Sequence, residues 1–223
     1  MKSSARSSSQ ERWLCFFNNV VYQTLASVYN SMDWLTFGIW WRLVQRALDF
    51  VPASASVLEI GFGPGRLHVE LARRSSLCVG LDLAVSMCHY TRRRLQHLGL
   101  NNRITRGSVF ALPYPPNAFD VVVSTFALSG FPRGADAMRE MARVTKVGGR
   151  VVLVDIGLPS SNSRAGVFWA RLWESMGDFL YEQRELMQQV GLKNTVFKEF
   201  GPGQHIRAVV GEKLPPTPGV VQA

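Results

Sequence analysis

Residues 57–65 read Val-Leu-Glu-Ile-Gly-Phe-Gly-Pro-Gly, and this stretch decides the fold. Its first four residues have the composition of a short buried strand, and three glycines then follow at alternate positions. A helical pattern over 66–74 begins directly after the last glycine. In a strand, glycine turn and helix of this kind, backbone N–H groups at the helix N-terminus can face a ligand that approaches closely. The stretch therefore predicts a binding loop in an α/β protein.

Strands and helices alternate on the C-terminal side of this loop. After the strand at 57–60 and the helix at 66–74, the sequence predicts strands at 78–81, 102–106, 119–123 and 150–155 and helices at 84–98 and 134–145. A long helical region at 165–190 precedes two strands, 194–200 and 205–210, whose short connection requires an antiparallel pair. The expected fold is α/β and Rossmann-like: a seven-stranded, mostly parallel sheet with an antiparallel C-terminal hairpin and helices on both faces.

The length of 223 residues suits one substantial domain with short appendages. Residues 1–10 are rich in serine and 214–223 contain three prolines, so both ends are expected to be disordered. Between them we expect a helical cap at 11–50 and the main domain at 51–213.

Cysteine content and hydropathy give an expectation for the cellular location of the protein. Cys15, Cys78 and Cys88 form no CxxC pair, so neither a disulfide framework nor a metal site is expected. No apolar run approaches the roughly 18 residues that cross a bilayer. We expect a cytoplasmic protein, and leave peripheral contact with a membrane surface open.

The net charge of +9 is unevenly distributed. Residues 83–119 contain five arginines and no acidic residue. A solvated helix face is the first interpretation of this stretch, and an anionic lipid surface is the second. Nucleic acid is the least favoured partner, because no groove-reading or base-stacking motif accompanies the charge.

Spacing around the glycine loop narrows the choice of ligand. A dinucleotide fingerprint counted from Gly61 needs glycine at position 66, where this chain has Arg66. Glu59, at the end of the strand, would repel a pyrophosphate but would suit a cationic amino group. Asp82 ends the second strand 21 residues after Gly61, the spacing at which a carboxylate reaches paired ribose hydroxyls. The loop therefore favours a cofactor with an amino group, a ribose and no phosphates.

Four segments, in order, resemble successive motifs of class I S-adenosylmethionine-dependent methyltransferases. They are residues 57–67, 80–82, 112–120 and 143–150. The resemblance spans about 50–210. Segment 29–38 is similar to the N-terminal cap of one branch of that class, which contains ubiquinone and menaquinone C-methyltransferases and bacterial phospholipid N-methyltransferases. The resemblance implies S-adenosylmethionine as the cofactor.

The same resemblance implies roles for individual residues. Glu59, Gly61 and Gly63 would line the methionine part of the cofactor, Gly65 would complete the loop, and Asp82 would hold the ribose.

Other implied contacts lie beyond the loop. Leu83 would pack on the adenine, Val109 would supply a backbone contact, and Ser124 would face the sulfonium. Tyr29 would close over the cofactor from the cap. Ser108 stands where these families often have Asp; it can accept a hydrogen bond from the adenine amino group, but more weakly.

Methyl transfer from a sulfonium is an in-line displacement, so alignment supplies much of the rate and no catalytic motif is obligatory. Residues 124–127, Ser-Thr-Phe-Ala, differ from the Asn/Asp-Pro-Pro-aromatic motif that binds exocyclic base nitrogens, so methylation of nucleic-acid bases is not expected. Asp155, at the end of the fifth strand, is a candidate for a base or an acceptor-orienting group, with a structural role as its alternative.

Aromatic residues suggest the acceptor. They crowd residues 13–41, and Trp169 and Trp173 lie four apart in the late helical region. Either they form an apolar lid over a lipophilic acceptor or they pack against the sheet as core. We expect a methyltransferase for a small lipophilic acceptor, a quinone-type ring or a phospholipid amine. A protein or RNA methyltransferase and a catalytically silent, methyltransferase-like binding module remain alternatives.

Overall fold

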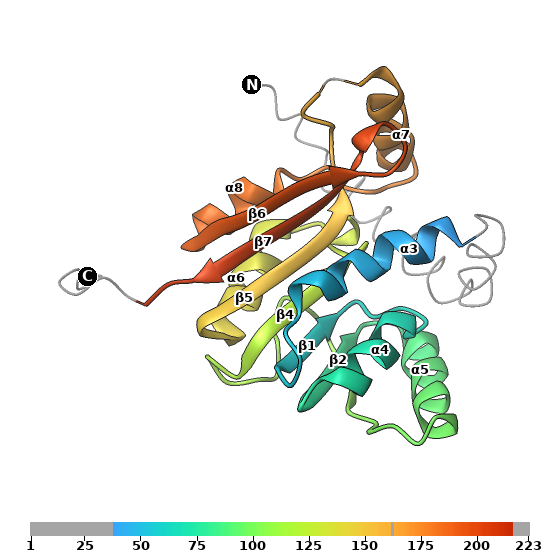
Figure 1. The fold of residues 1–223 in the computed structure, drawn as a ribbon, viewed down its shortest axis with the longest axis vertical. Helices are drawn as coiled ribbons and strands as arrows, with labels where there is room; N and C mark the ends of the chain where they lie inside the picture. Colours follow the sequence, from blue (N-terminus) through green and yellow to red (C-terminus); the bar gives the residue numbers. More distant parts are fainter. Residues whose placement is uncertain (1–37, 162, 216–223) are drawn as a thin grey trace.

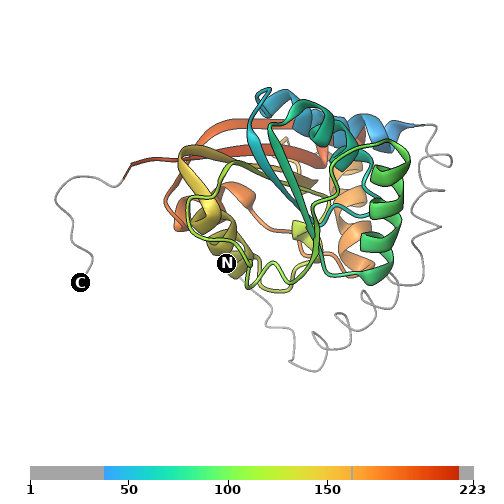
Figure 2. The same cartoon turned by 90° about the horizontal axis from the view of Figure 1, so that it is seen from below.

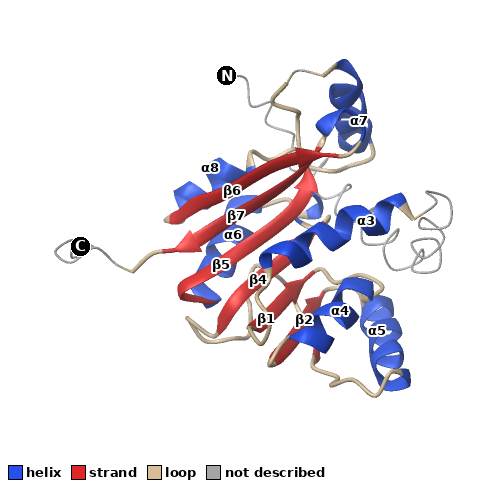
Figure 3. Cartoon of the chain, viewed as in Figure 1, coloured by secondary structure: helices blue, strands red, loops and turns tan. Residues whose placement is uncertain are grey.

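The computed structural model describes residues 38–161 and 163–215. Its centre is one seven-stranded sheet (Figures 1 and 3). The strands are β1 (Ser56–Ile60), β2 (Leu77–Asp82), β3 (Ile104–Arg106), β4 (Phe119–Thr125), β5 (Thr145–Ile156), β6 (Leu192–Phe200) and β7 (Ile206–Lys213). Their order is β3-β2-β1-β4-β5-β7-β6. Strands β1 to β5 are parallel, whereas β7 runs antiparallel to both β5 and β6, which confirms the expected fold class.

Helices cover both faces of the sheet (Figures 1 and 2). They are α3 (Ile39–Gln45), the 3-10 helix η1 (Arg46–Phe50), α4 (Arg66–Arg74), α5 (Val85–His97), α6 (Gly134–Val144), α7 (Arg164–Ser175) and α8 (Gln183–Gln189), with short 3-10 turns η2 (Leu128–Gly130) and η3 (Pro202–Gln204). Helices α3, α4 and α7 and the turn η1 pack on one face, and α6 and α8 pack on the other. Helix α5 packs beside α4.

The central strands are apolar on both faces because helices bury both. All five residues of β1 are buried, and successive side chains enter opposite layers of the core. Val57 packs with Leu67 and Leu71 of α4, whereas Leu58 packs in the cluster that contains Met138 and Met141 of α6. Full burial of such a side chain stabilises the fold by about 1.5–3 kcal/mol. This double burial explains why the adjacent residues Val57 and Leu58 are both apolar.

Two expected elements differ from the structure. The helical region at 165–190 is two helices, because Gly177 adopts a φ of 111° directly after α7. The backbone N–H of Phe179 then donates to Ser129 O at 2.7 Å, which holds the connecting segment against η2. Strand β5 begins at Thr145 rather than at residue 150, since Thr145 already pairs with Phe119 of β4.

Part of the predicted organisation lies outside the described residues. This applies to residues 1–37, which include Tyr29 and most of the expected cap, and to 216–223. The division into a cap at 11–50 and a main domain at 51–213 stays a prediction. Within residues 38–161 and 163–215, no helix is long and apolar enough to cross a membrane.

Candidate active site

A cleft of about 310 Å³ lies at the carboxyl ends of the parallel strands, on the side where an α/β sheet binds ligands. Segments from several elements line it: the loop at 59–64, the end of β2 at 81–84, residues 107–110, 125–127 and 130–132, and Trp40, Trp41 and Val44 of α3. The glycine loop and Asp82, which belong to different elements, therefore line the same cleft.

The glycine loop is shaped by left-handed backbone and close contacts. Gly61, Gly63 and Gly65 all have positive φ, between 52° and 72°. A Cβ on Gly65 would lie 2.4 Å from two side-chain atoms of Thr91, so packing alone requires glycine there. A Cβ on Gly63 would meet nothing within 4 Å, although Gly63 lines the cleft. The loop is thus packed at Gly65 and open at Gly63, where a ligand can approach the backbone.

Asp82 joins the glycine loop to the start of α5. Its Oδ2 accepts from Gly63 N at 3.0 Å, and its Oδ1 accepts from Ala84 N at 2.9 Å. Burial raises the pKa of Asp82 to about 6, although these backbone hydrogen bonds oppose the rise. Above that pH the carboxylate is an acceptor at the cleft, as ribose hydroxyls require.

Glu59 is the second carboxyl group of the cleft and is only 1% exposed. Its Oε2 lies 2.9 Å from His68 Nδ1, and this histidine is fully buried on α4. Burial raises the pKa of Glu59, and the hydrogen bond and charge of His68 act in the opposite direction. The sequence pattern had marked Glu59 but not its partner.

Three further predicted residues line the cleft: Leu83, Ser108 and Val109. Leu83 is 51% exposed, so its side chain is accessible to a ligand in the cleft. Ser108 Oγ accepts from Phe110 N at 3.2 Å, so its hydroxyl closes a local turn and still has a hydrogen to donate.

Ser124 and Gly65 do not line the cleft. Ser124 is completely buried, and its Oγ has no hydrogen-bond partner among the described residues. The next residue, Thr125, lines the cleft instead. Successive side chains of a strand point to opposite sides, so the alternation along β4 is the signal that separates these two positions.

Asp155 is also buried and outside the cleft lining. Its Oδ2 accepts from Ser129 N at 3.1 Å, and its Oδ1 accepts from Ile156 N at 2.8 Å. Burial raises the pKa of Asp155 to about 6. Burial and the charge of Asp155 together raise the pKa of Asp178 to about 6 as well. In this arrangement Asp155 fastens η2, directly before the residues at 130–132 that face the cleft.

An aromatic wall completes the cleft. It contains Trp40 and Trp41, which the sequence analysis offered as part of a lid or of the core, and Phe126 and Phe131, which it did not assign. The ring centroids of Trp40 and Phe126 lie 4.1 Å apart, and Trp173 of α7 lies 5.7 Å from Trp40 on the same side. The guanidinium of Arg66 lies over the ring of Trp41, at 4.4 Å from its centroid. No group of three or more His, Cys, Asp or Glu residues that could hold a metal ion occurs in the described ranges.

Comparison with known proteins agrees with this geometry. Residues 58–153 match the family model for a methyltransferase domain. Over 148 residues, 63% of the chain, the sequence is 30% identical to the ubiquinone/menaquinone biosynthesis C-methyltransferase UbiE of Blochmanniella pennsylvanica, covering 58% of that protein. Over 144 residues, 62% of the chain, it is 33% identical to the demethylmenaquinone methyltransferase of Thermus thermophilus, covering 66% of it. The alignments thus span less than two thirds of these relatives.

A solved structure supports the fold independently of sequence. A SAM-dependent methyltransferase from Thermotoga maritima superposes with a TM-score of 0.70 at 16% identity, over 86% of this chain and 98% of that one. Residues 58–153 therefore form a methyltransferase domain, as the order of the sequence motifs had predicted, and the chain has the fold of S-adenosylmethionine-dependent methyltransferases.

Proposed function

We propose that this chain transfers a methyl group from S-adenosylmethionine to a small lipophilic acceptor, a quinone-type ring or a phospholipid amine. The observation that carries the proposal is a single cleft with two kinds of wall. Glu59 and Asp82 supply carboxyl groups on one part of it, whereas Trp40, Phe126 and Phe131 make another part aromatic. A cationic, hydroxyl-bearing cofactor and an apolar acceptor fit these two walls.

The residues present suit S-adenosylmethionine, which supplies an activated methyl group on a sulfonium when it is bound. Glu59 offers a carboxylate to the cofactor's ammonium group, and Asp82 offers one to its ribose hydroxyls. Leu83 and Val109 offer apolar surface to the adenine, next to Ser108. The chain itself binds and aligns the reactants, which is the main requirement of an in-line displacement.

The acceptor is argued from the rest of the cleft. Glu59 and Asp82 are the only carboxyl-bearing residues in its described lining, which contains no histidine. A ring carbon or an unprotonated amine, which reacts without a strong base close by, suits such a wall. For Asp155 we propose a positioning role through η2, since it lies outside the lining. The names of the two quinone methyltransferases also support a quinone-type acceptor.

Cofactor binding and product identity test this function. Calorimetry with S-adenosylmethionine should show binding that Asp82→Ala weakens at least tenfold, because the variant lacks the ribose-facing carboxylate. Enzyme with methyl-labelled cofactor, incubated separately with a total lipid extract, a protein extract and RNA, should label the lipid fraction. Label in protein or RNA instead would favour the alternative enzyme function. No binding at high micromolar cofactor would leave only the silent binding module.

We also propose peripheral contact with an anionic membrane surface through α7. This helix exposes Phe168, Trp169 and Leu172, and Met176 directly after it is also exposed. Arg164 and Arg171 are exposed on the same helix, where Arg171 pairs with Glu174 at 2.6 Å. Apolar and basic side chains together suit a helix that lies in the headgroup layer of anionic lipid. The cytoplasmic location predicted from the sequence is compatible with such contact and stays a prediction.

Co-sedimentation with vesicles tests this contact. The protein should sediment with phosphatidylglycerol-containing vesicles and less with pure phosphatidylcholine, and high salt should weaken the difference. Replacement of Phe168, Trp169 and Leu172 by serine should abolish most of the sedimentation. Leu98→Ser, at a residue 47% exposed beyond the end of α5, is the matched control and should behave as wild type. Wild-type protein that remains in the supernatant with anionic vesicles would refute the proposal.

A further inference from the structure

The buried contact between Glu59 and His68 has no part in the function described so far. Both side chains are almost inaccessible, with 1% of Glu59 and none of His68 exposed, and their Oε2 and Nδ1 atoms lie 2.9 Å apart. His68 does not line the cleft, whereas Glu59 does. The histidine therefore reaches the ligand space only through the carboxyl group that it contacts.

Burial makes an ionised Glu59 costly unless a donor compensates for lost water. His68 on α4 is the partner nearest in the structure, and two further titratable groups on β2 face the same space. Cys78 Sγ lies 3.8 Å from both ring nitrogens of His68, and burial, with the charge of Glu59, raises the pKa of this thiol. The charge of Glu59 also raises the pKa of Asp82. Among residues 38–161 and 163–215, His68 is thus the hydrogen-bonding partner of Glu59, and Asp82 is a carboxyl neighbour on which the charge of Glu59 acts.

The proposed ligand of Glu59 gives this hydrogen bond a direction. Because Nδ1 faces Glu59, the ring can donate Nδ1–H to an ionised carboxylate, either as a neutral ring whose Nε2 accepts from the protonated Cys78 thiol or as an imidazolium. The opposite assignment needs a neutral Glu59 that donates to Nδ1. A neutral carboxylic acid would have little attraction for an ammonium group.

We propose that His68 is a positioning residue, which holds the Glu59 carboxylate ionised and oriented for the ammonium group of the cofactor. This inference rests on the proposed function, because it assigns His68 to the same cofactor site. It also explains why a histidine is buried completely on the helix that follows the glycine loop.

A matched pair of variants tests the proposal. Asn and Leu have nearly the same shape, and the amide nitrogen of Asn can occupy the place of Nδ1. His68→Leu should raise the Kd for S-adenosylmethionine on the order of tenfold, because a hydrogen bond to a charged group is lost. His68→Asn should recover most of the affinity. Thermal unfolding of both variants monitors folding, and equal losses of affinity in the two would overturn the proposal.

The pH dependence distinguishes positioning from a general structural role. Without His68, the pKa of Glu59 rises further, so the carboxyl group becomes protonated at a higher pH. The ratio of Kd values, His68→Leu over wild type, should therefore grow as the pH falls from 8 to 6. A Glu59 that loses its charge also lowers the pKa of Asp82, so the titration of Asp82 opposes the expected rise of the ratio and cannot produce it. A ratio that stays constant over this range would contradict the proposal.

A double-mutant cycle adds an independent readout. If His68 acts through Glu59, His68→Leu should cause little further loss of affinity in a Glu59→Gln background. Additive losses would show that His68 acts elsewhere.

A measurement on the wild-type protein keeps the inference testable if the variants fold poorly. Nitrogen-15 NMR of labelled histidine should show a proton on Nδ1 of His68, and a neutral ring protonated only at Nε2 would overturn the inference. Wild-type protein that fails to bind S-adenosylmethionine would contradict the proposed function, whereas binding that His68→Leu leaves unchanged would contradict this inference alone.

Discussion

At the scale of single residues, the glycine loop separates positions that the sequence treats alike. Gly63 and Gly65 both have positive φ, yet only Gly65 is enclosed. Thr91, which a Cβ at Gly65 would strike, also donates its hydroxyl to Gly63 O at 3.1 Å. Gly65 is therefore a packing position that supports the loop, whereas Gly63 presents backbone to the cleft.

Alanine at these two positions should have different effects. Gly65→Ala should lower the free energy of unfolding by roughly 2–5 kcal/mol, because left-handed strain and overpacking against Thr91 both act. Gly63→Ala should cost only about 1–2 kcal/mol of strain, but its methyl group would occupy open space at the cleft and weaken cofactor binding. Urea denaturation and calorimetry measure the two effects. A stable Gly65→Ala, or a Gly63→Ala that binds normally, would contradict this assignment.

At the scale of elements, local sequence patterns predicted a helix where the contacts that define it are close in the sequence. The helix predicted at 66–74 is α4, because a glycine fixes its start and its apolar face meets the adjacent strand. The break between α7 and α8 was not predictable from periodicity. It depends on Gly177 and on a hydrogen bond from Phe179 to Ser129, 50 residues earlier in the chain.

The candidate site likewise contains residues that sequence spacing predicts and residues that only tertiary contacts bring together. Glu59, Gly63 and Asp82 follow from spacing, since one strand-turn-helix unit and the next strand place them together. The aromatic wall needs tertiary contact, because Trp40 and Phe126 are far apart in the sequence and meet only after folding. The arginine-rich stretch at 83–119 likewise gains local roles, some of its side chains donating to backbone carbonyls of neighbouring segments.

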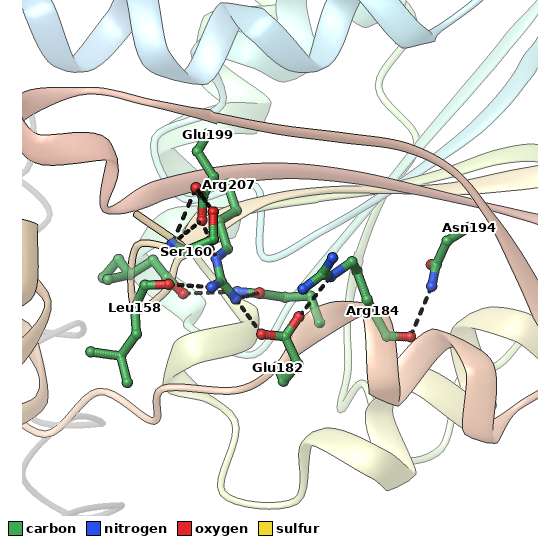
Figure 4. Close-up of polar contacts among 9 residues, drawn as sticks. Leu158, Ser160, Glu182, Arg184, Asn194, Glu199 and Arg207 are labelled. Carbon is green, nitrogen blue, oxygen red and sulfur yellow. Dashed lines mark hydrogen bonds and ion pairs between the residues drawn. The ribbon is translucent and has the colours of Figure 1, made fainter. Parts of the chain in front are cut away.

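At the scale of the whole molecule, one buried cation joins the antiparallel hairpin to the rest of the sheet. Arg207 of β7 is 4% exposed and lies at the centre of the polar network in Figure 4. It pairs with Glu182 before α8 at 2.6 Å and with Glu199 of β6 at 3.2 Å, and it donates to Leu158 O after β5. Glu199 also accepts from Ser160 N at 3.0 Å. The Arg207 side chain therefore connects segments that the sequence motifs did not relate to one another.

Removal of this cation should destabilise the whole fold. Arg207→Met should lower the free energy of unfolding by about 3–5 kcal/mol, because it leaves the nearly buried Glu199 carboxylate without its ion pair. Arg184→Met is the matched control: Arg184 pairs with the same Glu182 at 3.1 Å but is 43% exposed, so about 1 kcal/mol or less is expected. Adding Glu199→Gln to Arg207→Met should restore part of the loss, since the unpaired charge is then absent. Urea denaturation of the four proteins measures these differences, and equal effects of the two arginine substitutions would show that the network does not hold the hairpin in place.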